Sequence, residues 1–175
     1  MSLKKYLQQF SKEQLIGQII ELNVKYKEVK AYYEFSLNPN SNKAKEETKK
    51  IIGKCISTDI GAAGPDLKLR EARKAITNFK KLSPSESDLA DVMLFYAECG
   101  IEYAIFFGDI GGSFYDSIVG MFYDACKHIK ANGIQAQFMP RCKQTADKTA
   151  TIGWGLHDAL SGYCRDFFDP PEKAD

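Results

Sequence analysis

The chain has 175 residues, of which 44% are hydrophobic and 27% are charged, and this composition excludes the disordered and fibrous classes of protein. The formal net charge of +1 hides an asymmetry, because residues 1–81 carry 17 Lys/Arg against 9 Asp/Glu whereas residues 82–175 carry 7 against 14. The asymmetry indicates either a basic partner-facing surface or two halves that attract each other. The length fits one domain, which we expect at residues 1–168 with a flexible tail at 169–175.

The cysteines and the apolar stretches indicate a compartment. Five cysteines with no CxxC pair favour reduced thiols over disulfides or a metal centre. The first residues lack the apolar core of a signal peptide, and the longest nearly apolar stretch, residues 103–115, is too short to cross a bilayer as a helix. The sequence therefore predicts a cytoplasmic protein that does not enter a membrane.

The N-terminal part predicts a short helix at residues 2–9 and a long helix at residues 12–37. Ser11 and Gln14 have the spacing of a capping box, and Asn38-Pro39-Asn40 would end the long helix. Its apolar residues step by four and three along one face: Leu15, Ile19, Leu22, Tyr26, Val29 and Tyr33. This is the clearest helical periodicity in the chain.

Two further helices are expected at residues 42–60 and 66–81, separated by the turn Gly61-Ala62-Ala63-Gly64-Pro65. The first of them is rich in lysine. The second places its apolar residues Leu69, Ala72, Ile76 and Phe79 on one face, opposite a stripe that contains Arg70, Arg73, Lys74, Thr77 and Lys81. We therefore expect a surface helix with a basic ridge, which we define as Arg70, Arg73, Lys74 and Lys81.

Four helices complete the chain. Ser83-Pro84 resembles an N-cap before a buried central helix at residues 85–107. After Gly108–Gly112, Ser113 can cap a helix that ends at Asn132-Gly133, which makes an antiparallel hairpin. Two more helices are expected at residues 134–149 and 152–168. No alternating pattern of β-branched residues indicates a sheet, so the predicted fold class is all-α, with seven or eight helices packed as antiparallel hairpins in one bundle or short solenoid-like array.

Two segments of the sequence carry a resemblance to a known family. They are LKKYLQQFSKEQLIGQIIELNVKYKEVKAYYEFSLNP at residues 3–39 and DIGGSFYDSIVGMFYDA at residues 109–125. Both segments resemble a family of small, uncharacterised, all-helical bacterial proteins, a domain of unknown function. The resemblance implies a helical fold and bacterial origin, and it brings no catalytic residue with it.

The turn at Gly108–Gly112 is a possible site in the sequence. It precedes a helix N-terminus that could hold an anion, but it lacks the Lys-Ser/Thr of a P-loop and follows a helix, which favours a hairpin turn with positive φ. Several acidic and phenolic residues nearby could bind a divalent cation or serve acid/base chemistry: Glu98, Glu102, Asp109, Tyr115 and Asp116. The Glu-x-x-His partner of di-iron bundles is missing, so a solvated or lysine-paired acidic face is favoured.

The two histidines, His128 and His157, would form a zinc site or a Cys-His nucleophile only if they met Cys126 or Cys164 in space. Spacing does not place them together, so we predict no metal site, no catalytic residue and no cofactor. The chain is more simply explained as a non-enzyme.

The sequence favours a protein–protein interaction or scaffold module that acts through charged helical surfaces, by binding a protein partner or a second copy. The binding residues would be those of the basic ridge. The first alternative is nucleic-acid binding through the Lys/Arg-rich helices at residues 43–81. The second is a metal-dependent or small-ligand enzyme at the turn from Gly108 to Tyr115.

Overall fold

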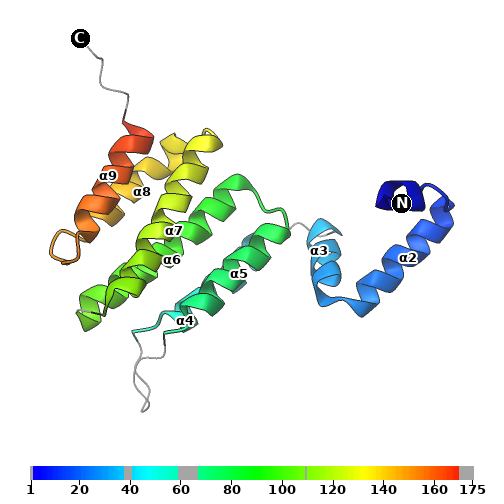
Figure 1. The fold of residues 1–175 in the computed structure, drawn as a ribbon, viewed down its shortest axis with the longest axis horizontal. Helices are drawn as coiled ribbons and strands as arrows, with labels where there is room; N and C mark the ends of the chain where they lie inside the picture. The colour runs from blue at the N-terminus through cyan, green and yellow to red at the C-terminus, as the bar shows by residue number, and fades with distance from the viewer. Residues whose placement is uncertain (1, 38–40, 59–66, 109, 170–175) are drawn as a thin grey trace, which may run out of the picture. The chain divides into compact units, whose positions relative to one another are not determined.

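The computed structural model of the protein describes residues 2–37, 41–58, 67–108 and 110–169. These residues form nine α-helices and no strand, which confirms the all-α fold class and adds a helix to the seven or eight expected (Figure 1). The chain divides into two compact units, Met1–Asn40 and Ser41–Asp175. Each unit is described by itself below.

The N-terminal unit contains α1 (Leu3–Leu7), α2 (Lys12–Lys25) and α3 (Lys27–Leu37). The predicted capping box begins α2. The backbone N–H of Gln14 donates to Ser11 Oγ at 3.2 Å, and the Ser11 N–H donates to Gln14 Oε1 at 2.8 Å. Both groups would otherwise be unpaired donors at the helix start, so the cap fixes where α2 begins.

The prediction of one continuous helix over residues 12–37 is wrong at Tyr26. This residue has extended backbone angles, φ −121° and ψ 119°, and separates α2 from α3. The two helices contact each other. An apolar 4-3 spacing marks the buried side of a helix but does not distinguish one long helix from two shorter ones that pack together. The expected stop at Asn38-Pro39-Asn40 lies outside the described residues.

The C-terminal unit opens with the helical hairpin of α4 (Ser41–Cys55) and α5 (Leu69–Lys81), which lie side by side (Figure 1). The expected helix at 42–60 ends earlier, at Cys55, and the one at 66–81 begins later, at Leu69. The predicted turn from Gly61 to Pro65 lies outside the described residues. On α5 three residues of the predicted apolar face, Ala72, Ile76 and Phe79, are buried, and the fourth, Leu69, is half-buried.

The centre of this unit is α6 (Glu86–Phe107), which contacts α4, α5 and the antiparallel α7 (Gly112–Ala131). Gly108 and Gly111 in the connecting turn have φ of 79° and 113°, as expected of a hairpin turn made by glycine. The two helices approach closely at Gly100. A Cβ atom on that residue would lie 2.6 Å from Cγ1 of Ile118 on α7.

The two predicted caps in this region are wrong in position. Ser85, not Ser83, caps α6, because its Oγ accepts the N–H of Asp88 at 3.1 Å. Ser113 lies inside the first turn of α7, whose N-cap is Gly111 without a side-chain hydrogen bond. In each case a serine adjacent to the helix start was available, and sequence spacing alone does not select which residue adopts the extended N-cap conformation.

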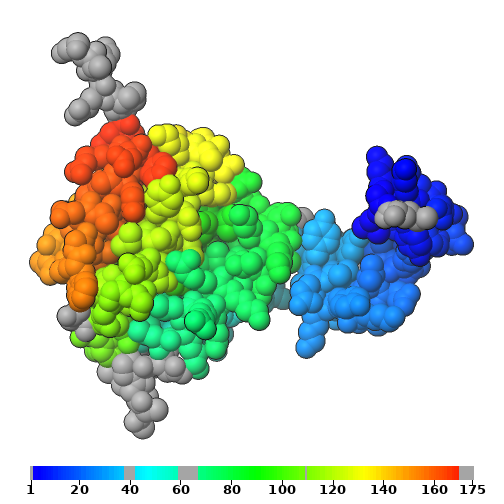
Figure 2. All heavy atoms as spheres, in the orientation of Figure 1, coloured from blue at the N-terminus to red at the C-terminus, as the bar shows by residue number. Residues whose placement is uncertain are grey.

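The last two helices are α8 (Gln135–Asp147) and α9 (Leu156–Phe168), shorter than the predicted 134–149 and 152–168. Pro140 lies within α8 and does not end it. Helices α7, α8 and α9 contact one another, and the space-filling view shows α4–α9 as one closely packed body (Figure 2). Among the residues that the structure describes, no helix has the length and apolarity needed to cross a membrane. Of the predicted tail, residues 170–175 lie outside the described part.

Candidate functional site

The basic ridge lies on α5, as predicted, but its four residues differ in their surroundings. Arg70, Lys74 and Lys81 are exposed, whereas Arg73 is half-buried. The Arg73 guanidinium donates from Nε to Ser117 Oγ at 3.1 Å and from Nη2 to the Ser117 carbonyl at 2.8 Å. It also lies 5.7 Å from the ring centroid of Tyr96. Arg73 therefore ties α5 to α6 and α7, while three residues of the ridge remain available to solvent.

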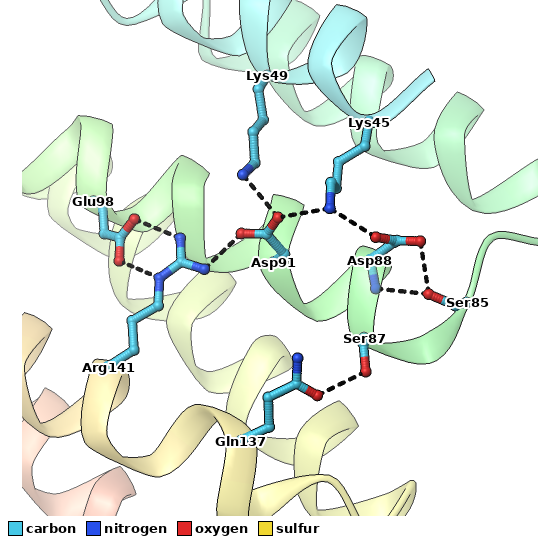
Figure 3. Close-up of polar contacts among 9 residues, drawn as sticks. All are labelled: Lys45, Lys49, Ser85, Ser87, Asp88, Asp91, Glu98, Gln137 and Arg141. Atoms are coloured by element: carbon cyan, nitrogen blue, oxygen red, sulfur yellow. Dashed lines mark hydrogen bonds and ion pairs between the residues drawn. The ribbon is translucent and has the colours of Figure 1, made fainter. Parts of the chain in front are cut away.

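The lysines of α4 are also used in part within the fold (Figure 3). Lys45 Nζ lies 2.9 Å from Asp88 Oδ1, and Lys49 Nζ lies 2.7 Å from Asp91 Oδ2. Both lysine side chains are less than a fifth exposed. Lys43, Lys50 and Lys54 are exposed. Part of the basic half of the chain is thus neutralised by the acidic half inside the C-terminal unit.

Arg141 on α8 extends this set of ion pairs to a third helix. Its guanidinium donates twice to Glu98, with both distances 2.7 Å, and its Nη1 lies 2.6 Å from Asp91 Oδ1 (Figure 3). The Thr145 hydroxyl also donates a hydrogen bond to Glu98 Oε1 at 3.3 Å. We call Lys45, Lys49, Asp88, Asp91, Glu98 and Arg141 the charge network. The charge network links α4, α6 and α8. Glu98, a candidate for metal binding or acid/base chemistry in the sequence, is paired with Arg141 in it.

Pairing in the charge network favours the ionised forms of Lys45, Asp91 and Arg141. Burial alone would raise the pKa of Asp91, but the hydrogen bonds and charges of Lys49 and Arg141 outweigh burial, so its pKa lies below the ordinary value. The hydrogen bond to Asp88 raises the pKa of Lys45 against the opposing effect of burial. The bidentate bond to Glu98 raises the pKa of Arg141. Each charge has a partner, so this arrangement serves packing of three helices more directly than proton transfer.

The remaining acidic residues near the turn do not converge. Glu102 and Asp116 are exposed, and Asp109 lies outside the described residues.

The two histidines bond to different parts of the fold. His128 Nε2 lies 3.0 Å from the Glu86 carbonyl oxygen and 3.1 Å from Glu86 Oε2, whereas His157 Nδ1 lies 3.0 Å from the Ala146 carbonyl oxygen. In the described part of the chain, no three His, Cys, Asp or Glu side chains are placed to hold a metal ion.

All five cysteines are free thiols, and four of them are buried. Cys126, Cys142 and Cys164 come from α7, α8 and α9 and lie in one core. Burial raises the pKa of Cys99 and of Cys164 to about 12, and a hydrogen bond with Cys142, together with burial, raises that of Cys126. Thiols with raised pKa are poor nucleophiles at neutral pH, so these residues act as small apolar core side chains.

A hollow lies beside the turn between α6 and α7, the place of the second functional alternative. Its volume is about 390 Å³, and it is lined by Ala104, Ile105, Gly108, Tyr115, Thr151, Ile152, Gly153 and Trp154. Gly108 and Tyr115 were singled out in the sequence. The described acidic and histidine candidates, Glu98, Glu102, Asp116, His128 and His157, are not among the lining residues.

A family described as "Family of unknown function (DUF6155)" matches residues 1–167. The chain belongs to this family. No curated protein and no solved structure matches the chain. The family match confirms the resemblance to an all-helical family of unknown function, while bacterial origin stays a prediction.

The DUF6155 match covers both compact units, so the N-terminal helices belong to the shared family sequence. None of the residues described in α1, α2 and α3 is buried. Of the large hydrophobic side chains that are exposed in the described residues, ten of fifteen belong to this unit: Leu3, Tyr6, Ile16, Ile19, Ile20, Leu22, Val24, Tyr26, Tyr32 and Leu37. We call these ten the N-terminal apolar surface.

Sequence reasoning missed both this surface and Trp154. The apolar periodicity of residues 15–33 places these side chains along one face of a helix, but periodicity does not say whether anything covers that face. Trp154 is the one tryptophan of the chain and stands between Gly153 and Gly155. A large aromatic residue between two glycines was an available signal of an exposed ring in a loop.

Proposed function

We propose that the protein is a self-association module, in which the N-terminal apolar surface packs against the same surface of a second copy. The observation that carries this proposal is the concentration of exposed large hydrophobic residues in α1–α3, a unit with no buried residue. Large hydrophobic side chains exposed in this number are typical of interaction sites. It also supports the expected interaction module, with apolar contacts in place of purely charged ones.

Size supports association. Chains below about 40 residues rarely bury enough surface to fold without metals, disulfides or oligomerisation. The ten side chains of the N-terminal apolar surface are each 41–80% exposed, and together they offer on the order of 800 Å², which is the area per partner of a standard interface. We therefore expect the N-terminal unit to gain stability mainly when a partner covers its apolar surface.

Charge and polar contacts support a second copy as the partner. Residues 1–40 contain six Lys and four Glu, so the unit does not require a strongly charged partner. A groove of about 250 Å³ between α2 and α3 is lined by Ile19, Ile20, Asn23, Lys30, Tyr33, Glu34 and Leu37. The Asn23 Oδ1 atom is buried there without a hydrogen-bond partner among the described residues. A symmetric copy brings apolar side chains and lysine donors to the same groove.

Sedimentation equilibrium from 1 to 200 µM tests this proposal. We expect a reversible dimer, and the double variant Ile19→Ser/Ile20→Ser should raise its dissociation constant by tenfold or more. Ile51→Ser is the matched control, because Ile51 is a similarly exposed isoleucine on α4, and it should leave the dissociation constant unchanged. A monomer at 200 µM, or equal effects of both changes, contradicts the proposal.

Hydrogen exchange separates the other possible occupants of the surface. A monomer in which residues 12–37 are protected would mean that the chain covers this surface by itself. A monomer with rapid exchange there would mean that a different protein partner is required.

A second candidate function is nucleic-acid binding, favoured by the three exposed cations of the basic ridge on α5. Arg70, Lys74 and Lys81 form no ion pair with any described residue. Clustered cations of this kind bind phosphate backbones with a strong salt dependence. The triple change to glutamate at these positions should abolish binding of labelled duplex DNA and leave the fold intact. Arg73 is left unchanged because it bonds Ser117. Absence of binding by the unaltered protein at 50 mM salt contradicts this function.

A further inference from the structure

The hollow beside the α6–α7 turn has the size of a small-molecule site. Its volume of about 390 Å³ falls in the range of known ligand pockets, roughly 300–1,000 Å³. It is lined by Ala104 and Ile105 near the end of α6, by the C-cap Gly108, and by the segment from Thr151 to Trp154. Tyr115, from the first turns of α7, completes it.

Two aromatic rings shape this hollow. The rings of Tyr115 and Trp154 stack with their centroids 5.8 Å apart and an angle of 19° between planes. Tyr115 is buried, and its hydroxyl donates to the Gly108 carbonyl at 3.3 Å. Trp154 is 62% exposed. One ring is therefore fixed in the fold and supports the second, which presents indole surface to solvent.

The backbone at Trp154 is strained. Its φ is +63°, in the left-handed region that is unfavourable for a bulky side chain. Hydrogen bonds at the start of the segment hold it, since the Thr149 hydroxyl donates to the Ala146 carbonyl at 2.6 Å and the Ile152 N–H donates to the Thr149 carbonyl at 2.9 Å. Residues held in strained conformations are enriched at active sites and ligand clamps.

The lining selects a chemical class of ligand. The eight described lining residues are uncharged, so none of them offers a counter-ion that would offset the lost hydration of a charged ligand. A flat ring can stack on the indole of Trp154, and the Thr151 hydroxyl with the peptide groups of residues 151–153 can bond polar ring atoms. We infer that this hollow binds an uncharged, planar aromatic compound that carries one or two polar ring atoms.

The single tryptophan makes the test direct, because it gives one indole N–H signal in a ¹⁵N–¹H spectrum of the full chain. Unlabelled indole is the probe, with cyclohexanol as an uncharged ring that cannot stack and benzoate as a charged aromatic ring. We expect a saturable shift of the Trp154 signal with indole, and dissociation constants at least tenfold higher for the other two. Equal binding of all three compounds, or no shift with indole at 5 mM, overturns the inference.

Variants locate the site. Trp154→Gly should weaken indole binding at least tenfold, followed on the backbone signals of Ile152 and Gly153, while Trp154→Phe should give an intermediate loss because a ring remains. Glycine tolerates φ of +63°, so the backbone of the first variant can keep its course. Phe106→Ala is the control, since Phe106 is a 63% exposed aromatic residue outside the lining. Undiminished binding by Trp154→Gly, or an equal loss in Phe106→Ala, overturns the inference.

Discussion

Asp91 is the residue at which the charge network joins three helices. Its Oδ1 lies 2.6 Å from Arg141 on α8 and its Oδ2 lies 2.7 Å from Lys49 on α4. Burial raises the pKa of a carboxylate and pairing with cations lowers it, so the direction of the Asp91 pKa shift shows which effect is larger. The pKa of Asp91 is lowered. Pairing is therefore the larger effect, and the ionised carboxylate stabilises the fold.

The lowered pKa of Asp91 predicts how the stability of the fold depends on pH. A carboxylate whose pKa is lower in the folded chain contributes stability that is present above its unfolded pKa, about 3.9, and is lost as pH falls through the folded value. Asp91→Asn should therefore be less stable than the unaltered protein at pH 7, by about 2–4 kcal/mol, because Lys49 loses its carboxylate partner and Arg141 keeps only Glu98. The difference should stay constant down to about pH 5 and shrink below pH 4.

Urea denaturation of both proteins between pH 7 and pH 2.5 measures that difference. Asp158→Asn is the control, since Asp158 is exposed on α9 and outside the charge network, and it should change the free energy of unfolding by less than about 0.5 kcal/mol. A difference for Asp91→Asn that grows as pH falls would show that burial, not pairing, dominates at this carboxylate.

Gly100 tests how closely α6 and α7 pack. Alanine favours a helix over glycine by about 1 kcal/mol, but a Cβ at this position would lie 2.6 Å from Cγ1 of the buried Ile118. We expect Gly100→Ala to lower the free energy of unfolding by about 1–3 kcal/mol. At Gly53 on α4 nothing lies within 4 Å of the added atom, so Gly53→Ala should instead raise it by about 1 kcal/mol. Chemical denaturation of both variants checks the pair, and stabilisation by Gly100→Ala as well as by Gly53→Ala would mean that α6 and α7 are farther apart.

At the scale of elements, the break at Tyr26 is the feature that separates the structure from the sequence pattern. Tyr26 has the extended backbone that a residue before proline prefers, and Lys27 is the first residue of α3, where proline fits without the loss of a hydrogen bond. Lys27→Pro should therefore preserve the helical content and stabilise the break by about 0.4–1 kcal/mol. If residues 12–37 formed one helix, the same proline would cost about 3 kcal/mol.

Circular dichroism at 222 nm with a thermal melt distinguishes these results. Lys25→Pro is the matched control, because Lys25 is the last residue of α2 and its N–H belongs to the helix. We expect helical content to fall in Lys25→Pro and not in Lys27→Pro. A loss of similar size in both variants would favour the continuous helix.

The elements that sequence could predict are those determined by local signals. The capping box at Ser11, the buried face of α5 and the glycine turn after α6 each depend on residues that are neighbours in sequence, and each is present. The contact between α2 and α3 on either side of Tyr26, and the stacking of Trp154 on Tyr115 of α7, join residues that are not neighbours in sequence. The basic ridge shows the same division, because its stripe on α5 was predictable whereas the bonds of Arg73 to Ser117, 44 residues away, were not.

At the scale of the whole molecule, the burial pattern assigns the core to one unit. All buried side chains among the described residues lie between Thr48 and Cys164, whereas the N-terminal unit has none. The charge asymmetry of the chain has the same location, since the ion pairs that join basic and acidic halves lie within the C-terminal unit. The two units therefore differ in what stabilises them. The C-terminal unit has a buried hydrophobic core, whereas the N-terminal unit has an exposed apolar surface that we propose is covered by association.

Deletion of residues 1–40 tests this division. Because the core is complete without them, we expect residues 41–175 to keep the melting temperature of the full chain within about 3 °C, and to keep the near-ultraviolet signal of Trp154. A peptide of residues 1–40 should be weakly helical when dilute and gain helix with concentration, since its apolar side chains are covered by association. A fall of more than about 10 °C in the deleted protein would instead mean that residues 1–168 unfold as the single domain that the sequence predicts. The concentration dependence of the peptide then decides separately whether the N-terminal apolar surface recognises itself.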